Sequence, residues 1–189
     1  MDNLAFDRYK ERFEILNGEI YAMSPRPSVK HNMIAANIFT AFANYFKGKS
    51  CIAFSDGVDV KITENDTVIP DVMIVCNRSI IKPDAIYGSP DLVVEVLSPG
   101  TAKRDRGYKK DLYGAHGVKE YWIVDSESKI VEVYVNEDKE MRLDNVYEVY
   151  PDYMIEKMSE DERANIMDKI GISMQPDFEL PLSDIFQTF

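Results

Sequence analysis

Residues 91–125 read DLVVEVLSPGTAKRDRGYKKDLYGAHGVKEYWIVD, and this stretch decides the fold that we expect. It begins as an apolar run that contains one acid, Glu95, turns at the sequence SPG (98–100), continues with a basic helical pattern and ends in a second apolar run, 121–124. The order strand, turn, helix, strand is typical of folds in which helices cover a β-sheet. A carboxylate inside a buried strand is costly to desolvate unless it is paired, hydrogen-bonded or bound to a metal ion. Glu95 therefore requires an explanation, and one hypothesis is a metal-dependent active site.

Length and composition predict one compact domain. The chain has 189 residues, of which 45% are hydrophobic and 29% charged, and we expect a single domain over 1–189. Its apolar runs are too short to cross a bilayer, and the charged N-terminus, MDNLAFDRYKERF, does not resemble a secretory signal. We therefore expect a cytoplasmic protein with no membrane segment. Cys51 and Cys76 stand far apart in apolar contexts, which predicts buried thiols rather than a disulfide framework or a structural zinc site.

The charge is distributed unevenly along the chain. The formal net charge is −11, which opposes tight, sequence-blind binding to a polyanion. Residues 1–135 hold 17 Lys and Arg against 19 Asp and Glu, whereas the last 54 residues hold 5 against 14. Within the nearly neutral part, 101–110 carries five basic residues and one acid. A small basic patch is therefore expected beside the strand that contains Glu95.

Other segments carry local signals. Asn17-Gly18 between two short alternating runs predicts a β-hairpin with a type I′ turn, and Glu19 directly follows that turn. Apolar spacing from Ser28 predicts a helix that ends near Gly48. Strands are predicted at 51–54, at 58–62, at 67–76 with an interruption at Pro70, and, in antiparallel arrangement, at 129–135, 140–143 and 146–150.

The signals at the two ends of the chain are weaker. Polar residues 7–12 are compatible with a short helix. Ser159 followed by Glu162 is a capping-box arrangement, which predicts a helix over 159–170. We interpret the tail, 176–186, as a loop with a short terminal turn.

Two of the predicted strands carry an acid on a defined face. Successive side chains alternate across a strand, so Glu95 shares a face with Val93, and Asp71 shares one with Met73. If the two strands are neighbours, Asp71 and Glu95 converge, and two carboxylates with water form an oxygen cage suited to Mg²⁺ or Mn²⁺. Such an ion polarises a phosphoryl oxygen and lowers the pKa of a bound water molecule. A nearby lysine would stabilise the negative charge of the transition state.

The residues that carry this chemistry resemble a known family. PDVMIV at 70–75, GSPDLVVEVLSP at 88–99, RDRG at 104–107 and GVKEYWIVD at 117–125 are similar to the PD-(D/E)XK nuclease superfamily and, within it, to the Uma-two family of endonucleases. The resemblance covers most of the chain except the acidic segment 151–172. It implies an α/β (α+β) restriction-endonuclease-like fold, in which helices flank a mixed central β-sheet, with an N-terminal β-hairpin and a C-terminal antiparallel extension.

The resemblance also implies roles for individual residues. Asp71 and Glu95 match the ligands of Mg²⁺ or Mn²⁺, and DNA is the implied substrate. The superfamily places its lysine two residues after the acid, where this chain has Leu97. The matching position in the family is Lys109 on the following helix, whose long stem can reach the strand end. Glu19 corresponds to an additional acid from an N-terminal element. A homodimer is expected from the fold family, since two copies can cut two strands.

Each of these residues also has a purely structural interpretation. Glu95 could be a buried acid that is paired only with Lys109. Asp105 and Lys109, four positions apart on a helix, could form a surface ion pair worth about 0.3–0.5 kcal/mol. His31 is interpreted as a packed or capping histidine rather than a general base. For the whole protein, two alternatives to an endonuclease stay open: a catalytically vestigial nuclease-like scaffold for oligomerisation or protein binding, and a hydrolase of a small phosphorylated substrate.

Overall fold

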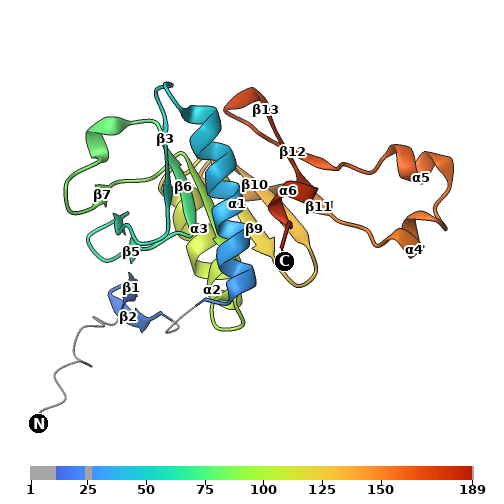
Figure 1. Cartoon of the computed structure of the whole chain (residues 1–189). Coiled ribbons are helices and arrows are strands. Elements are labelled where there is room, and N and C mark those ends of the chain that lie inside the picture. Colours follow the sequence, from blue (N-terminus) through green and yellow to red (C-terminus); the bar gives the residue numbers. More distant parts are fainter. Residues whose placement is uncertain (1–11, 24–26, 189) are drawn as a thin grey trace, which may run out of the picture.

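A six-stranded mixed β-sheet forms the centre of the protein (Figure 1). The structure, a computed structural model of the chain, describes residues 12–23 and 27–188. The strand order is β11-β10-β9-β8-β6-β3, and β8 and β9 are parallel whereas the other neighbours are antiparallel. The strands are β3 (Ile52–Ser55), β6 (Val72–Val75), β8 (Leu92–Val96), β9 (Glu120–Asp125), β10 (Ile130–Glu137) and β11 (Glu140–Glu148). A parallel pair needs a crossover connection, which the predicted helix between the two apolar runs of 91–125 supplies.

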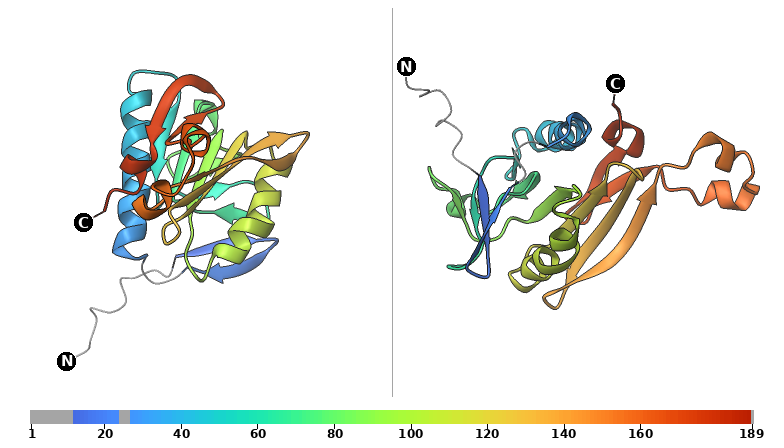
Figure 2. Two further views of the ribbon diagram at one scale, coloured as in Figure 1. Left: turned by 90° about the vertical axis from the view of Figure 1, so that its right-hand side faces the viewer. Right: turned by 90° about the horizontal axis from the view of Figure 1, so that it is seen from below.

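One face of this sheet is covered by α1 (Val29–Phe46), as Figure 2 shows. The helix begins where predicted, because the Ser28 Oγ accepts a hydrogen bond from the backbone N–H of His31 at 3.1 Å. Its buried stripe includes Ile34, Ile38 and Phe42, which belong to one core with β6, β8 and β9. Three C-terminal elements complete this core: β12 (Lys169–Ile172), β13 (Gln175–Pro181) and α6 (Leu182–Ile185).

The opposite face of the six-stranded sheet packs against a second hydrophobic core. A helical segment and the strands of a second sheet contribute to this core. The helical segment consists of α2 (Ala102–Arg104), a π-helical turn η2 (Asp105–Lys109) and α3 (Lys110–Ala115). A second sheet has the order β2-β1-β5-β4-β7, with β1 (Phe13–Leu16), β2 (Glu19–Ala22), β4 (Val60–Lys61), β5 (Thr67–Val68) and β7 (Ile86–Tyr87). A short 3-10 helix, η1 (Arg78–Ile80), precedes β7. The predicted mixed sheet with flanking helices and an N-terminal hairpin is confirmed.

The segment 67–76 differs from the single strand that the sequence predicts. It forms β5 and β6, which belong to different sheets, and the chain changes sheet at 69–71. Pro70 lies in this break, where no ladder hydrogen bond is required of it. Asp71 is therefore the residue directly before β6, at the junction between the two sheets.

The two cysteines form a disulfide, so the prediction of two buried thiols was wrong. Cys51 directly precedes β3 and Cys76 directly follows β6, and these strands pair with Ile52 opposite Val75. This antiparallel register places the cysteines opposite each other. The two cysteines are 25 positions apart in the sequence, and only the pairing of β3 with β6 brings them together.

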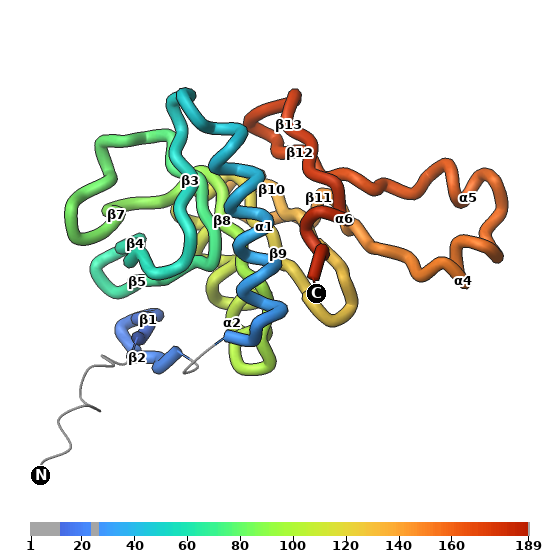
Figure 3. The backbone as a smooth tube through the Cα atoms, viewed as in Figure 1, coloured from blue at the N-terminus to red at the C-terminus, as the bar shows by residue number. Residues whose placement is uncertain are grey.

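Three C-terminal predictions need correction. Residues 140–148 form one continuous strand, whereas two strands, 140–143 and 146–150, were predicted. Most of the tail that was interpreted as a loop forms β13, which pairs with β12. The capping box at Ser159 is present, but its helix α5 (Glu160–Ala164) ends early, and the last residues of the predicted helix form β12. With α4 (Asp152–Ile155), α5 belongs to an excursion that projects from the body (Figure 3).

Polar residues 7–12 are compatible, by their sequence, with a short helix. The short helix at 7–12 lies, apart from Arg12, outside the residues that the structure describes. Among the helices of the described residues, none has the length and apolar character that crossing a membrane requires.

Candidate active site

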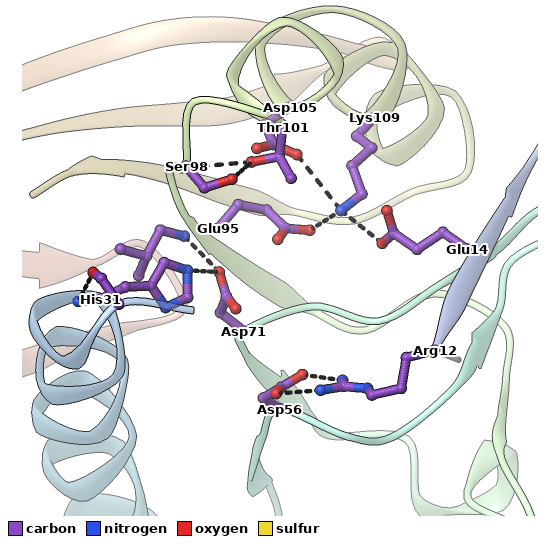
Figure 4. A network of polar contacts seen from close by, with 12 residues as sticks. Arg12, Glu14, His31, Asp56, Asp71, Glu95, Ser98, Thr101, Asp105 and Lys109 are labelled. Carbon is purple, nitrogen blue, oxygen red and sulfur yellow. Dashed lines mark hydrogen bonds and ion pairs between the residues drawn. The ribbon is translucent and has the colours of Figure 1, made fainter. Parts of the chain in front are cut away.

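A buried lysine is the centre of a cluster of acids (Figure 4). The Nζ of Lys109 lies 2.8 Å from Oε1 of Glu14, 2.8 Å from Oε1 of Glu95 and 3.6 Å from Oδ1 of Asp105. All four residues are at least 95% buried. The hydroxyl of Tyr113 donates a second hydrogen bond to Oε1 of Glu95 at 2.9 Å. The lysine and the tyrosine therefore fix one side of the Glu95 carboxylate.

Glu95 reaches this cluster because of strand alternation. In β8, Val94 and Val96 face the α1 core, whereas Val93 belongs to the core beneath α3. Glu95 shares the face of Val93, and it therefore points toward the helical segment that carries Lys109.

The π-helical turn places Asp105 and Lys109 on the inner side of that segment. Gly107, in the middle of the turn, has non-helical backbone angles, φ −110° and ψ −105°. Such turns are frequent at functional sites. Asp105 is 1% exposed and Lys109 is 2% exposed, so the interpretation of these two residues as a surface ion pair was wrong. Leu97 is half-buried and takes no part in the cluster.

The N-terminal hairpin supplies Glu14 rather than Glu19. Asn17 and Gly18 both have positive φ, 53° and 79°, as the predicted type I′ turn requires. In β1, Glu14 shares the buried face with Leu16 and is 3% exposed, and its Oε1 also accepts the backbone N–H of Ile69 at 3.1 Å. Glu19 is exposed and accepts a hydrogen bond from the hydroxyl of Tyr21. The structure therefore does not bring Glu19 into the cluster.

Asp71 lies beside Glu95 at the adjoining strand end. β6 pairs with β8 with Val72 opposite Val94, so continuation of the register places Asp71 opposite Glu95. The Oδ2 of Asp71 accepts the backbone N–H of Val96 at 2.8 Å, which holds the carboxylate against the end of β8. Figure 4 shows Asp71 in contact with His31, and Glu95 in contact with Lys109. The register therefore places the two acids at adjoining strand ends, and their joint binding of a metal ion stays a prediction.

His31 contacts Asp71 from the first turn of α1. Its Nε2 lies 3.3 Å from Oδ2 of Asp71, and the imidazole is mostly buried. Burial lowers the pKa of His31, but the hydrogen bond and the charge of Asp71 outweigh burial and raise it. The histidine is packed, as predicted, and in addition it orients the acid of the candidate site.

The charged groups of the cluster shift one another's pKa. Burial raises the pKa of Glu95 well above its ordinary value, although the charge of Lys109 opposes this effect. Burial also raises the pKa of Asp105. Burial alone would lower the pKa of Lys109, but the charges of Glu95, Glu14 and Asp105 raise it well above the ordinary value. With Glu14, three acids share one ammonium, so a nearby cation would offset the excess negative charge.

The donor atoms available at this place fit a hard divalent cation. Asp71 and Glu95 offer carboxylate oxygens, which Mg²⁺ and Mn²⁺ prefer. Within 12–23 and 27–188, no three His, Cys, Asp or Glu residues form a group that could hold a metal ion. Lys109 occupies the position between Glu14 and Glu95. An ion at this place would therefore rest on Asp71, Glu95 and water, and this ligand set stays a prediction.

A second buried acid shows what a purely structural carboxylate looks like in this protein. Burial raises the pKa of Glu120, which is 1% exposed. Its Oε1 accepts the indole N–H of Trp122 at 2.7 Å, and its Oε2 accepts the backbone N–H and the hydroxyl of Ser173 at 2.7 and 2.6 Å. These neutral donors satisfy both oxygens and tie the β12–β13 hairpin to β9. Glu95 differs, because it pairs with a charged lysine and the negative charges of neighbouring acids act on it.

Sequence reasoning missed Glu14 and the roles of Tyr113 and Asp105. Glu14 stands two positions before Leu16 in a short alternating run, so its place on the buried face was a usable signal. Tyr113 lies four positions after Lys109, on the same side of a helix. The inward direction of Asp105 depends on the π-helical turn, for which we find no signal in the sequence.

The order of the sheet and the acids at adjoining strand ends define a restriction-endonuclease-like protein. The sequence profile of the Uma2 family, described as "Putative restriction endonuclease", matches residues 2–165. The chain belongs to this family. An uncharacterised protein of Synechocystis sp. is 36% identical over 136 residues, which is 70% of either chain. A crystal structure from Anabaena variabilis, described as a putative nuclease of DUF820, superposes with a TM-score of 0.70 over 97% of this chain and 94% of that one. At 19% identity, this second likeness shows the fold alone.

Proposed function

We propose that the protein is a metal-dependent endonuclease that hydrolyses phosphodiester bonds of DNA. One observation carries this proposal: Asp71 and Glu95 meet at adjoining strand ends, and a buried lysine is hydrogen-bonded to the second acid. The same lysine contacts Glu14 and Asp105, so it is held in place before any substrate binds. Catalytic groups that are held rigidly in this way stabilise charge that develops in a transition state.

Each residue has a distinct task in this proposal. Asp71 and Glu95 would hold Mg²⁺ or Mn²⁺, which, when bound, supplies a Lewis acid and lowers the pKa of a coordinated water molecule. Lys109 stays protonated at neutral pH because the surrounding acids raise its pKa, so it stabilises negative charge at the phosphate and does not act as a general base. Tyr113 holds the carboxylate of Glu95 in a fixed orientation. A homodimer stays a prediction.

Cleavage assays with and without the metal test this function. The purified chain is incubated with supercoiled plasmid and with single-stranded DNA in Mg²⁺, in Mn²⁺, and in excess EDTA. We expect nicked or linear plasmid with the metals and none with EDTA. Cleavage that persists in EDTA would contradict metal dependence. If neither DNA is cut, hydrolysis of nucleotides would favour the small-substrate alternative, and failure to bind Mn²⁺ would favour the vestigial scaffold.

Two glutamates of the same hairpin separate the role of Glu14 from that of Glu19. Glu14→Gln removes a charge that holds Lys109, and we expect cleavage to fall about 10–100-fold, as is typical when an orienting partner of a site is lost. The matched variant Glu19→Gln changes an exposed acid outside the cluster. Its amide oxygen can still accept the hydroxyl of Tyr21, so the variant should retain nearly full activity. Initial rates on plasmid DNA provide the comparison. A larger loss for Glu19→Gln than for Glu14→Gln would restore Glu19 as the accessory acid.

A further inference from the structure

Arg104 is the member of the basic patch with a buried donor that has no hydrogen-bond partner among the described residues. Among the described residues, Arg106 pairs with Glu132, Lys109 is buried in the acid cluster, and the ammonium of Lys110 lies 5.3 Å from the ring centroid of Tyr134. The guanidinium of Arg104 forms no salt bridge within the part of the chain that the structure describes, and its Nε is fully buried without a hydrogen-bond partner. A buried donor without an acceptor is costly, which points to an acceptor outside the described residues.

An aromatic ring fixes the direction of this guanidinium. The Cζ of Arg104 lies 5.0 Å from the ring centroid of Tyr21, within the range of a cation–π contact. The hydroxyl of Tyr21 donates to Oε2 of Glu19 at 2.8 Å, which holds the ring. Stacking uses the face of the guanidinium, and Arg104 as a whole is only half-buried, so its terminal N–H groups remain for an acceptor from outside. A planar group with several parallel donors matches the oxygens of a phosphate.

Arg104 and Tyr21 lie next to the candidate active site. Tyr21 is directly opposite Glu14 in the hairpin, and opposite residues of an antiparallel pair share a face. Arg104 directly precedes Asp105, whose carboxylate is 3.6 Å from the Nζ of Lys109. Glu14 and Asp105 are buried, whereas Tyr21 and Arg104 are half-buried. The pair therefore forms the outer, solvent-accessible layer above the acid cluster.

We propose that Arg104, stacked on Tyr21, binds a backbone phosphate of the nucleic acid beside the bond that is cut. The inference rests on the proposed endonuclease function and adds a binding residue to it. It also explains how an acidic protein can hold a polyanion: the contact is local, because Arg104 brings a positive charge to the edge of a cluster that is otherwise rich in carboxylates. Arg104 acts on binding and not on the chemical step.

Salt-dependent DNA binding tests this assignment. Fluorescence anisotropy of a short fluorescein-labelled duplex is measured in EDTA, which prevents cleavage, from about 50 to about 200 mM salt. Arg104→Gln is expected to weaken binding about tenfold at the lowest salt and to make the slope of log K against log salt shallower by about 1, as the loss of one phosphate contact requires. Tyr21→Leu should weaken binding in the same direction. Arg104→Lys should restore the slope but not the full affinity, because it keeps the charge without the planar group.

The control is Arg142→Gln, which removes the same charge from β11, three strands from β8. It should leave both affinity and slope unchanged. The slope is independent of the fraction of active protein, so partial misfolding of a variant cannot imitate the effect.

Equal slopes for wild type, Arg104→Gln and Arg142→Gln would overturn the assignment, and metal-dependent cleavage by the wild type would show that the endonuclease function survives. Arg104-dependent binding without cleavage would support the phosphate site and reject the endonuclease. A wild type that neither binds nor cuts DNA would overturn both.

Discussion

Replacing Asp71 with asparagine is expected to lower the rate of DNA cleavage by at least about 10²–10³-fold. Asparagine has nearly the same shape, and its amide oxygen can still accept the backbone N–H of Val96, which Oδ2 accepts at 2.8 Å in the wild type. What it lacks is the negative charge that an ion would require, so Glu95 would be the only remaining carboxylate ligand. The loss should therefore concern chemistry far more than folding, with a change in unfolding free energy of about 1–2 kcal/mol.

The measurement is the initial rate on supercoiled plasmid in Mg²⁺ and in Mn²⁺, together with calorimetric titration of Mn²⁺. Asp71→Asn should lose most Mn²⁺ binding, whereas DNA binding in EDTA should persist. The matched control is Asp84→Asn, an exposed acid near Lys61, which should cut DNA at the wild-type rate. Wild-type cleavage by Asp71→Asn would eliminate Asp71 as a metal ligand.

The central unit of the fold could be predicted because its signals are local. Residues 91–125 contain two apolar strands and a helical crossover, and the structure places them as β8, the α2–α3 segment and β9. The alternation rule then located Glu95 and Asp71 on converging faces, and the register of β6 and β8 agrees. Asp71 directly precedes β6, so the side-chain alternation of β6 still applies to it although 67–76 forms two strands.

The errors occurred where tertiary contacts decide. A capping box sets where α5 starts, but pairing with β13 takes residues 169–170 out of the predicted helix, because they belong to β12. The disulfide between Cys51 and Cys76 depends on the register of two strands that are distant in sequence. Glu14 and Glu19 lie on either side of the same turn, and the sequence offers an acid on each strand of the hairpin. The place of Glu14 on the same strand face as Leu16 favours it, and the packing of the hairpin on Lys109 brings it into the cluster.

Replacing Lys109 with methionine is expected to destabilise the fold by about 3–5 kcal/mol near neutral pH. Methionine fills a similar volume but leaves Glu14, Glu95 and Asp105 buried without the ammonium that now lies 2.8, 2.8 and 3.6 Å from their oxygens. The cost should depend on pH. Acids whose pKa is raised by folding, as for Glu95 and Asp105, stabilise the fold below their ordinary pKa and lose that contribution as pH rises through the folded value.

The deficit of Lys109→Met relative to the wild type should therefore grow as pH rises from about 4 toward 8. Urea unfolding followed by circular dichroism at pH 5 and pH 8 provides the measurement. Lys103→Met, an exposed change in the same helical segment, should show no such dependence.

The double variant Glu95→Gln, Lys109→Met should recover part of the stability, since it removes one uncompensated charge. It should not recover cleavage, because both the ammonium and a metal ligand are then absent. An equal deficit at both pH values would show that Lys109 contributes packing alone, and the electrostatic role assigned to it would be wrong.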